Sequence, residues 1–163
     1  PVAISLMREV TPPRLTSVAV ATMSATMGVG GAIGLPLAAL PLYALFVWLG
    51  ASPLLIASLL LPAFALGVWA CEVTGRALGV PDHGGMVWDE IVAMWAVLVC
   101  LPETPMAWGL GFGLFRLFDI VKPWPIGWLD ARVKGGFGVM LDDALAAGFA
   151  LAVWVGLVRV FGF

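Results

Sequence analysis

Two pairs of adjacent carboxylates draw attention in this 163-residue chain, because each pair lies at the edge of an apolar run. Asp89 and Glu90 precede IVAMWAVLVC, and Asp142 and Asp143 precede ALAAGFALAVWVGLV. Asp119 adds an acidic residue at the predicted end of another helix. Carboxylates in a first helical turn gain about 0.3–1 kcal/mol from the helix dipole, so capping would account for either pair alone. Two pairs and a further aspartate, in a chain with only 10 acidic residues, favour an acidic functional centre.

Clustered carboxylates repel one another unless a cation joins them, and hard oxygen ligands favour Mg²⁺ over zinc. The candidate metal ligands are Asp89, Glu90, Asp119, Asp142 and Asp143. Mg²⁺ is typically held by one or two carboxylates together with substrate phosphate. The basic side chains that would suit such an anion are Arg116, Lys122, Arg132 and Lys134. For each of these cations, salt bridging or membrane topology is an equal alternative, and Arg116 and Asp119 are spaced to pair on one helix face.

Other routes to phosphate chemistry lack their residues. The stretch CEVTGR is one residue too short between Cys71 and Arg76 for a phosphocysteine loop. The sequence has no DxDx[TV] motif, no GxxxxGK[ST] motif and a single histidine, His83. A metal-activated water is therefore the remaining hydrolytic mechanism. His83 is a candidate general acid, although a solvated loop histidine fits its position equally well.

The elements that must position these residues are apolar helices. The chain is 62% apolar and only 11% charged, and residues 15–71 carry no formal charge. About 20 apolar residues suffice for one transmembrane helix. We therefore predict an all-α integral membrane protein, with a single domain over residues 1–163 and no nucleic-acid partner. Arg8 and Arg14 imitate the charged start of a signal peptide, but apolar sequence continues past the candidate cleavage site and favours retention.

Proline, glycine and charged residues divide the chain into about five hydrophobic helices, at residues 37–49, 53–70, 88–101, 106–120 and 140–160. Residues 15–34 are predicted to form a re-entrant or partial helix and a glycine-rich loop. Ser52 and Pro53 suit the N-cap and first position of the second helix. Polar connections are expected at 72–87 and 121–139. The third and fourth helices are short for a bilayer core of about 30 Å, which indicates a buried hairpin.

The positive charges predict an orientation. If Arg8 and Arg14 lie in the cytoplasm, the connections at 72–87 and 121–139 lie there as well, with their basic residues. Arg159 is the exception. Seven of the 10 carboxylates lie in or beside these two connections: Asp82, Asp89, Glu90, Asp119, Asp130, Asp142 and Asp143. They can therefore converge at the cytoplasmic face of the membrane.

Two stretches, HGGMVWDEIVAMW and FRLFDIVKPWPIGWLDARVKGGFGVMLDDALAAG, closely resemble the signature blocks of the bacterial phosphatidylglycerophosphatase A family. The resemblance covers about residues 30–160, and its blocks fall at 82–95 and 115–148. It implies a Mg²⁺-dependent, multi-pass phosphatase of the bacterial inner membrane. Such an enzyme converts phosphatidylglycerophosphate to phosphatidylglycerol, and its oligomeric state is not implied.

The resemblance also suggests roles for individual residues. The family's motif residues fall on Asp89, Glu90, Asp119, Asp130, Asp142, Asp143, Arg116 and Lys122. The expected catalytic residues are Asp89, Glu90, Asp143 and His83. Arg116, Lys122 and Lys134 are expected to hold phosphate, and Asp130, Gly135 and Gly136 to support the site. One departure is the family's PGTxGS loop, which reads GGAIGLP here and keeps Gly31 and Gly34 but loses the hydroxyl groups.

Two alternatives of other classes remain open from the residues alone. A small ion-coupled transporter would use the acidic cluster to bind cations, although acids at mid-span would suit it better than acids near helix ends. A noncatalytic membrane scaffold would use the same acids only as helix caps.

Overall fold

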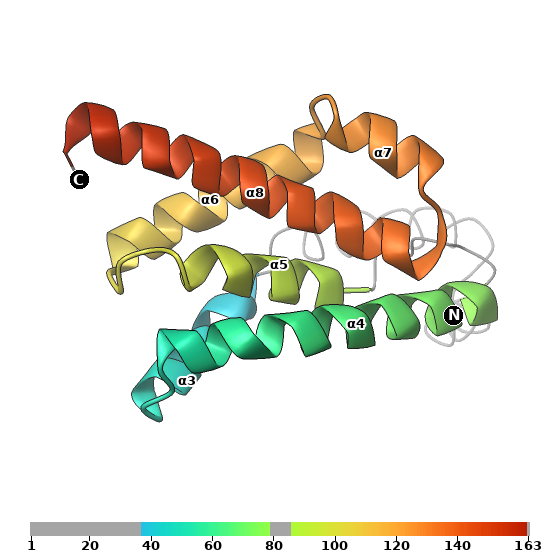
Figure 1. Ribbon diagram of the computed structural model, residues 1–163, viewed down its shortest axis with the longest axis horizontal. Helices are drawn as coiled ribbons and strands as arrows, with labels where there is room; N and C mark the ends of the chain where they lie inside the picture. Colours follow the sequence, from blue (N-terminus) through green and yellow to red (C-terminus); the bar gives the residue numbers. More distant parts are fainter. Residues whose placement is uncertain (1–36, 79–85, 163) are drawn as a thin grey trace, which may run out of the picture. The chain divides into compact units, whose positions relative to one another are not determined.

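The computed structural model describes residues 37–78 and 86–162, all within one compact unit, Pro36–Phe163. These residues form helices and contain no strand, which confirms the predicted all-α class. The helices, labelled as in Figure 1, are α3 (Ala39–Trp48), α4 (Pro53–Leu78), α5 (Trp88–Leu98), α6 (Pro105–Val121), α7 (Ile126–Arg132) and α8 (Gly135–Phe161). The predicted re-entrant segment at 15–34, the GGAIGLP loop and His83 lie outside the described residues.

The turn between α3 and α4 forms where the sequence predicts it. Ser52 Oγ accepts a hydrogen bond from Leu55 N at 3.2 Å, and Pro53 opens the helix, where its missing N–H costs nothing. However, α4 continues to Leu78. The prediction of a polar connection from residue 72 is therefore wrong. Glu72 and Arg76 extend the helix and pair across one turn at 2.7 Å.

The short helix α5 lies at the centre of the described bundle. It contacts α3, α4, α6 and α8, and Met94, Val97 and Leu98 on it are fully buried. Its 11 residues extend only about 16 Å, much less than a bilayer core of about 30 Å. The predicted short buried hairpin is thus confirmed for its first helix only, because α6 (Pro105–Val121) has 17 residues and exposes Met106, Leu117 and Ile120. α6 follows after a turn in which Thr104 caps the helix by accepting from Ala107 N at 3.2 Å.

The segment predicted as a loop, residues 121–139, is largely helical. It contains α7, and α8 begins at Gly135 rather than at residue 140. α8 begins at Gly135 because its first turn is held against α4. Helix propensity does not predict this start, since glycine is a poor helix former. Gly136 N donates to Glu72 Oε2 at 2.7 Å, and a Cβ at Gly136 would collide with the carbonyl oxygen of Val68. Only a glycine lets the two helices approach this closely.

Figure 1 shows that the connections divide between two ends of the helices. The α3–α4 turn, the α5–α6 turn and the end of α8 lie at one end. The last turns of α4, α7 and the beginnings of α5 and α8 lie at the other. The last turns of α4 and the segment at residues 121–139 thus lie at the same end, and residues 79–85 lie outside the described residues.

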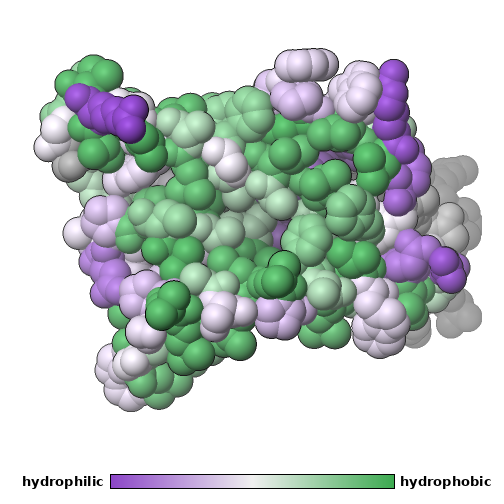
Figure 2. Space-filling model, viewed as in Figure 1, coloured by the Kyte–Doolittle hydropathy of each residue, from purple (hydrophilic) through white to green (hydrophobic). Residues whose placement is uncertain are grey.

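The surface exposes long apolar helices, as expected of a membrane-associated protein. α4 and α8 are long and apolar enough to cross a membrane, and large side chains such as Leu54, Leu61 and Trp69 are exposed on α4. In Figure 2, hydrophobic residues cover the middle of the visible face, while hydrophilic residues gather toward its two ends. Leaving this much apolar surface in water would be unfavourable.

The α4–α8 contact can be tested by substituting glycines on one helix. We expect Gly136→Ala to lower the free energy of unfolding by about 1–3 kcal/mol, because its Cβ meets the α4 backbone. Gly148→Ala is the matched control, since a Cβ there has nothing within 4 Å, and it should gain up to about 1 kcal/mol from helix propensity. Denaturant titration of the protein in detergent measures both. Equal responses would contradict the close contact.

Candidate functional site

Four charged side chains are buried among the described residues. They are Asp89, Arg116, Asp142 and Asp143, with exposed fractions of 6%, 8%, 6% and 4%. They come from the first turn of α5, the last turns of α6 and the interior of α8. All four were singled out in the sequence, and the tertiary structure brings them together. Since buried charges are costly unless they are paired, this cluster is the strongest candidate for a functional site.

The carboxylates of three helices converge on Asp143. It lies within hydrogen-bonding reach of Asp119 on α6 and close enough to Asp89 and Asp142 for their charges to repel. Its Oδ2 atom is buried and has no hydrogen-bond partner among residues 37–78 and 86–162. A buried carboxylate oxygen in this state is a site for a proton or a cation.

The register of α8 changes the interpretation of its aspartates. Because the helix begins at Gly135, Asp142 and Asp143 lie more than two turns inside it, about 10–12 Å from its start. The prediction that they open a helix is wrong, and they cannot act as caps. Asp89 and Glu90 do occupy the first turn of α5, as predicted. The acidic cluster is therefore inset from the end of the helices.

Arg116 joins two of the acidic residues. Its Nη1 atom lies 2.9 Å from Glu90 Oε1 and 2.5 Å from Asp119 Oδ2. The predicted pairing of Arg116 with Asp119 is confirmed, and the bridge to Glu90 adds a tie between α6 and α5. The side chain is only 10% exposed, so these ion pairs lie in surroundings where charges interact strongly. Arg116 thereby holds two carboxylates at the edge of the cluster.

Lys122 joins α6 to α8. Its Nζ donates to Asp142 Oδ2 and lies 3.2 Å from Asp130 Oδ2. Burial alone would lower the pKa of the Lys122 ammonium, but the hydrogen bond and charge of Asp142, helped by Asp130, raise it above its usual value. Lys122 therefore stays positively charged at neutral pH. It neutralises one of the buried carboxylates.

The backbone of Lys122 is held in an unusual conformation. Lys122 caps the C-terminus of α6 with φ at +43°, in the left-handed region where glycine is the usual residue. A non-glycine residue there costs about 1–2 kcal/mol. The ion pairs of its side chain with Asp142 and Asp130 offset this cost.

The other predicted basic residues lie farther out. Lys134 is exposed, and its Nζ donates to the carbonyl oxygen of Asp130 at 2.9 Å. Arg132 stacks over the Trp128 ring, 4.2 Å from its centroid. Within the described parts of the chain, we find no interaction that links either side chain to the buried carboxylates. The predicted phosphate-binding role of Lys134 stays a prediction.

Glu72 is a residue that the sequence analysis did not select. Its carboxylate, on α4, accepts a hydrogen bond from Gly136 N and so holds the first turn of α8. Asp142 and Asp143 lie farther along the same helix. A Cβ on Gly135 or Gly136 would meet its carboxylate or the backbone beside it. These two glycines thus make room for Glu72, and their predicted supporting role at the site stays a prediction. The only signal in the sequence was its spacing of four residues from Arg76.

The buried ion pair between Lys122 and Asp142 can be measured by a double-mutant cycle. We expect Lys122→Ala to cost about 3 kcal/mol of unfolding free energy, because it leaves Asp142 buried without its cation. Adding Asp142→Asn should restore part of that loss, with a coupling energy of about 1–3 kcal/mol. Arg76→Ala, at a largely exposed pair, is the control and should cost at most about 1 kcal/mol. Additive losses at Lys122 and Asp142 would refute the coupling.

Together, the fold and the site define a class: a helical protein with membrane-length apolar helices and a buried carboxylate centre braced by one arginine and one lysine. The chain belongs to the phosphatidylglycerophosphatase A family, whose family model matches residues 17–158. The resemblance inferred from the two sequence blocks is thereby confirmed. No solved structure matches the chain.

Curated relatives carry consistent names. The chain is 48% identical over 82 residues to phosphatidylglycerophosphatase A of Escherichia coli (strain K12), covering 50% of this chain and 48% of the relative. The same enzyme of Haemophilus influenzae is 47% identical over 91 residues, covering 55% and 56%. A putative phosphatidylinositol-3-phosphatase of Bacteroides thetaiotaomicron is 38% identical over 97 residues, covering 55% and 60%. The chain thus spans about half the length of the curated relatives it matches.

Proposed function

We propose that this protein is a Mg²⁺-dependent membrane phosphatase that hydrolyses phosphatidylglycerophosphate to phosphatidylglycerol and inorganic phosphate. The observation that carries the proposal is the convergence of Asp89, Asp119, Asp142 and Asp143 on one buried centre. Membership of the phosphatidylglycerophosphatase A family supplies the reaction and the lipid substrate. The relatives are named as phosphatases, so none supports the alternative of an ion-coupled transporter.

Charge balance supports a cation at this centre. The cluster holds five carboxylates, from Asp89, Glu90, Asp119, Asp142 and Asp143. Among residues 37–78 and 86–162, the ion pairs with these carboxylates come from Arg116 and Lys122. An excess of negative charge in apolar surroundings is unstable unless protons or a metal ion compensate it. With all groups ionised, five carboxylates and two basic side chains leave three negative charges, and a divalent cation would reduce these to one.

The donor chemistry fits Mg²⁺. Carboxylate oxygens are the ligands that this ion prefers, and the orphaned Oδ2 of Asp143 offers one directly. Asp89, Asp119 and Asp143 would hold it, since Asp89 and Asp119 lie close to Asp143. Asp119 would do so while also paired with Arg116. In the described residues, no three acidic, histidine or cysteine side chains are yet arranged to hold a metal. Side-chain rotation would have to draw these carboxylates together.

The reaction requires one bond to form and one to break. A P–O bond forms to the oxygen of water, while the P–O bond to the glycerol oxygen of the headgroup breaks. Bound Mg²⁺ would polarise the phosphoryl oxygens and lower the pKa of the water. Asp143 would accept the proton of the water at a carboxylate oxygen. The leaving glycerol oxygen takes up one proton, for which His83 stays the predicted donor.

The arrangement of charges supports a site at the cytoplasmic face of the bacterial inner membrane. Arg76, Lys122 and Lys134 lie at the end that carries the acidic cluster, and positive residues favour the cytoplasmic side. α8 has 27 residues and extends about 40 Å, enough to cross a core of about 30 Å. Its aspartates, about 10–12 Å from its start, would then lie where the headgroups meet the hydrocarbon.

The activity is tested with purified protein, Mg²⁺ and phosphatidylglycerophosphate in mixed micelles. We expect phosphate release from the parent protein and a loss of at least about 100-fold in Asp143→Asn, which lacks the proton acceptor. Glu103→Gln is the matched control, since this exposed carboxylate lies in the α5–α6 turn, and its activity should be unchanged. Phosphatidylinositol 3-phosphate, chosen from the name of the third relative, serves as the competing substrate. Undiminished turnover in Asp143→Asn would refute the assigned site.

Metal binding has a separate readout in stability. We expect Mg²⁺ at 100 times its Kd to stabilise the parent protein by about 2.7 kcal/mol. With a chelator, Asp143→Asn should unfold at a higher temperature than the parent, because one repelling charge is gone. With Mg²⁺, the order should reverse. Thermal unfolding that is unaffected by Mg²⁺ would remove the metal from the proposal.

A further inference from the structure

An apolar groove leads away from the acidic centre between α4, α5 and α8. It has a volume of about 320 Å³, at the low end of the usual range for small-molecule sites. Val92 and Ala93 on α5 form its floor and are buried. Ala57 and Leu61 on α4 and Ala144 on α8 line it and are exposed. The groove therefore opens sideways, onto the apolar surface of the protein rather than toward its polar end.

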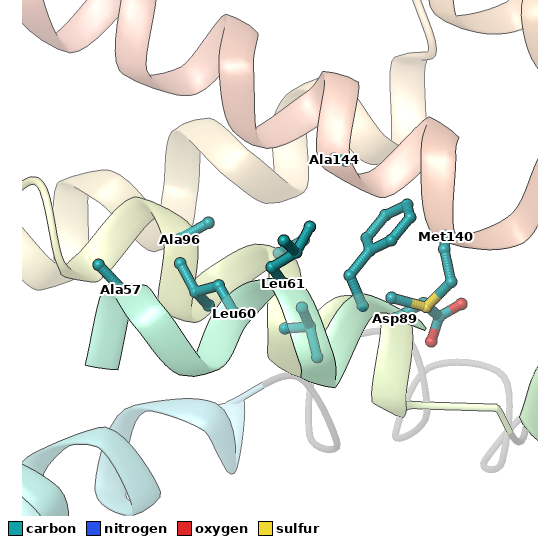
Figure 3. A pocket seen from close by; sticks show the side chains of 10 residues that line it. Ala57, Leu60, Leu61, Asp89, Ala96, Met140 and Ala144 are labelled. Carbon is teal, nitrogen blue, oxygen red and sulfur yellow. The ribbon is translucent and has the colours of Figure 1, made fainter. Parts of the chain in front are cut away.

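The two ends of the groove differ in chemistry. Figure 3 shows Asp89 and Met140 at one end and Ala57 and Ala96 at the other. Among the described residues of the lining, Asp89 is the one that carries a charge, and the same side chain belongs to the buried carboxylate cluster. From Asp89 to Ala96 along α5 the groove runs about 10 Å. An occupant that suits both ends is an amphiphile with its polar part toward Asp89 and its hydrocarbon toward Ala57 and Ala96.

We propose that this groove binds the glycerol backbone and one acyl chain of the phospholipid substrate, which enters sideways from the membrane between α4 and α8. The proposal rests on the proposed function, because it takes the acidic centre to be the place where the phosphate is hydrolysed. A second copy of the chain is the competing occupant, and the labelling and cross-linking measurements below distinguish it from lipid.

The small side chains at the far end determine what fits. Alanines at positions 57 and 96 leave the volume that hydrocarbon would occupy, and Leu60 and Phe64 form an apolar wall. Each methylene group of the acyl chain that makes close contact with the groove should add to the binding free energy. Lipids with longer chains should therefore bind more tightly. A substrate with short acyl chains does not extend to Ala57. The groove therefore makes the enzyme selective for long-chain lipid.

The test fills the far end with one bulky side chain and leaves the carboxylates intact. Ala57→Trp blocks the groove, and Ala65→Trp is the matched control, because Ala65 is an exposed alanine on the same helix outside the lining. We expect Ala57→Trp to raise the KM for dipalmitoyl phosphatidylglycerophosphate about tenfold, because the chain would lose its contact through roughly two methylene groups. Its KM for the dihexanoyl lipid should change less than twofold. Ala65→Trp should change neither. Equal changes for the two lipids would overturn the proposal.

A binding readout keeps this test separate from the activity. Phosphatidylglycerol with a diazirine near the end of one acyl chain should label α4 around Ala57 and α5 around Ala96 in the full-length protein. The label should fall at least fivefold in Ala57→Trp but not in Ala65→Trp. If the parent protein releases no phosphate, the proposed function fails while this labelling still decides the groove. Labelling spread evenly over the exposed leucines would overturn the proposal. So would disulfide-linked dimers of Ala57→Cys beyond those of the parent, because a second copy would then fill the groove.

Discussion

The mutual repulsion of buried carboxylates is the constraint on which the rest of this structure depends. Asp89, Asp142 and Asp143 are almost completely removed from solvent and lie close together. Two cations offset part of their charge, with Arg116 bound to Glu90 and Asp119 and Lys122 bound to Asp142. The ion pairs that Arg116 and Lys122 form among α5, α6 and α8 therefore also reduce the repulsion among the carboxylates. The proposed metal ion would offset more of this charge.

The helices are arranged so that these charges can meet. α5 is short and central, so its first turn delivers Asp89 and Glu90 to a level more than two turns inside α8. α4 and α8 approach closely at Gly136, where Glu72 accepts from the backbone and fastens the first turn of α8. The backbone conformation at the end of α6 also brings a charged side chain to the cluster. The left-handed cap at Lys122 directs a lysine toward the cluster where glycine would be the ordinary choice.

Polar chemistry and apolar surface occupy adjoining parts of the molecule. The carboxylates are inset from the polar end, and the groove that begins at Asp89 opens onto a face covered with exposed leucines. A lipid phosphate presents the same two requirements, since its charged end needs cations and its chains need hydrocarbon surroundings. The described residues therefore place the buried carboxylates beside the groove that we propose for the lipid.

The sequence by itself determined the helical class, the turn at Ser52 and Pro53, the family and most acidic residues of the site. These follow from the composition, from capping residues next to the helix they cap, and from two long motifs. All of them can be recognised within short stretches of the chain. Only the tertiary structure decided that α8 begins at Gly135, that Glu72 belongs to a helix and that Arg116 bridges α6 to α5. Each of these depends on a partner 26 or more residues away, such as Glu72 for Gly136 and Glu90 for Arg116. Local propensity carries no information about such partners, because their free energy is gained only when distant helices come into contact.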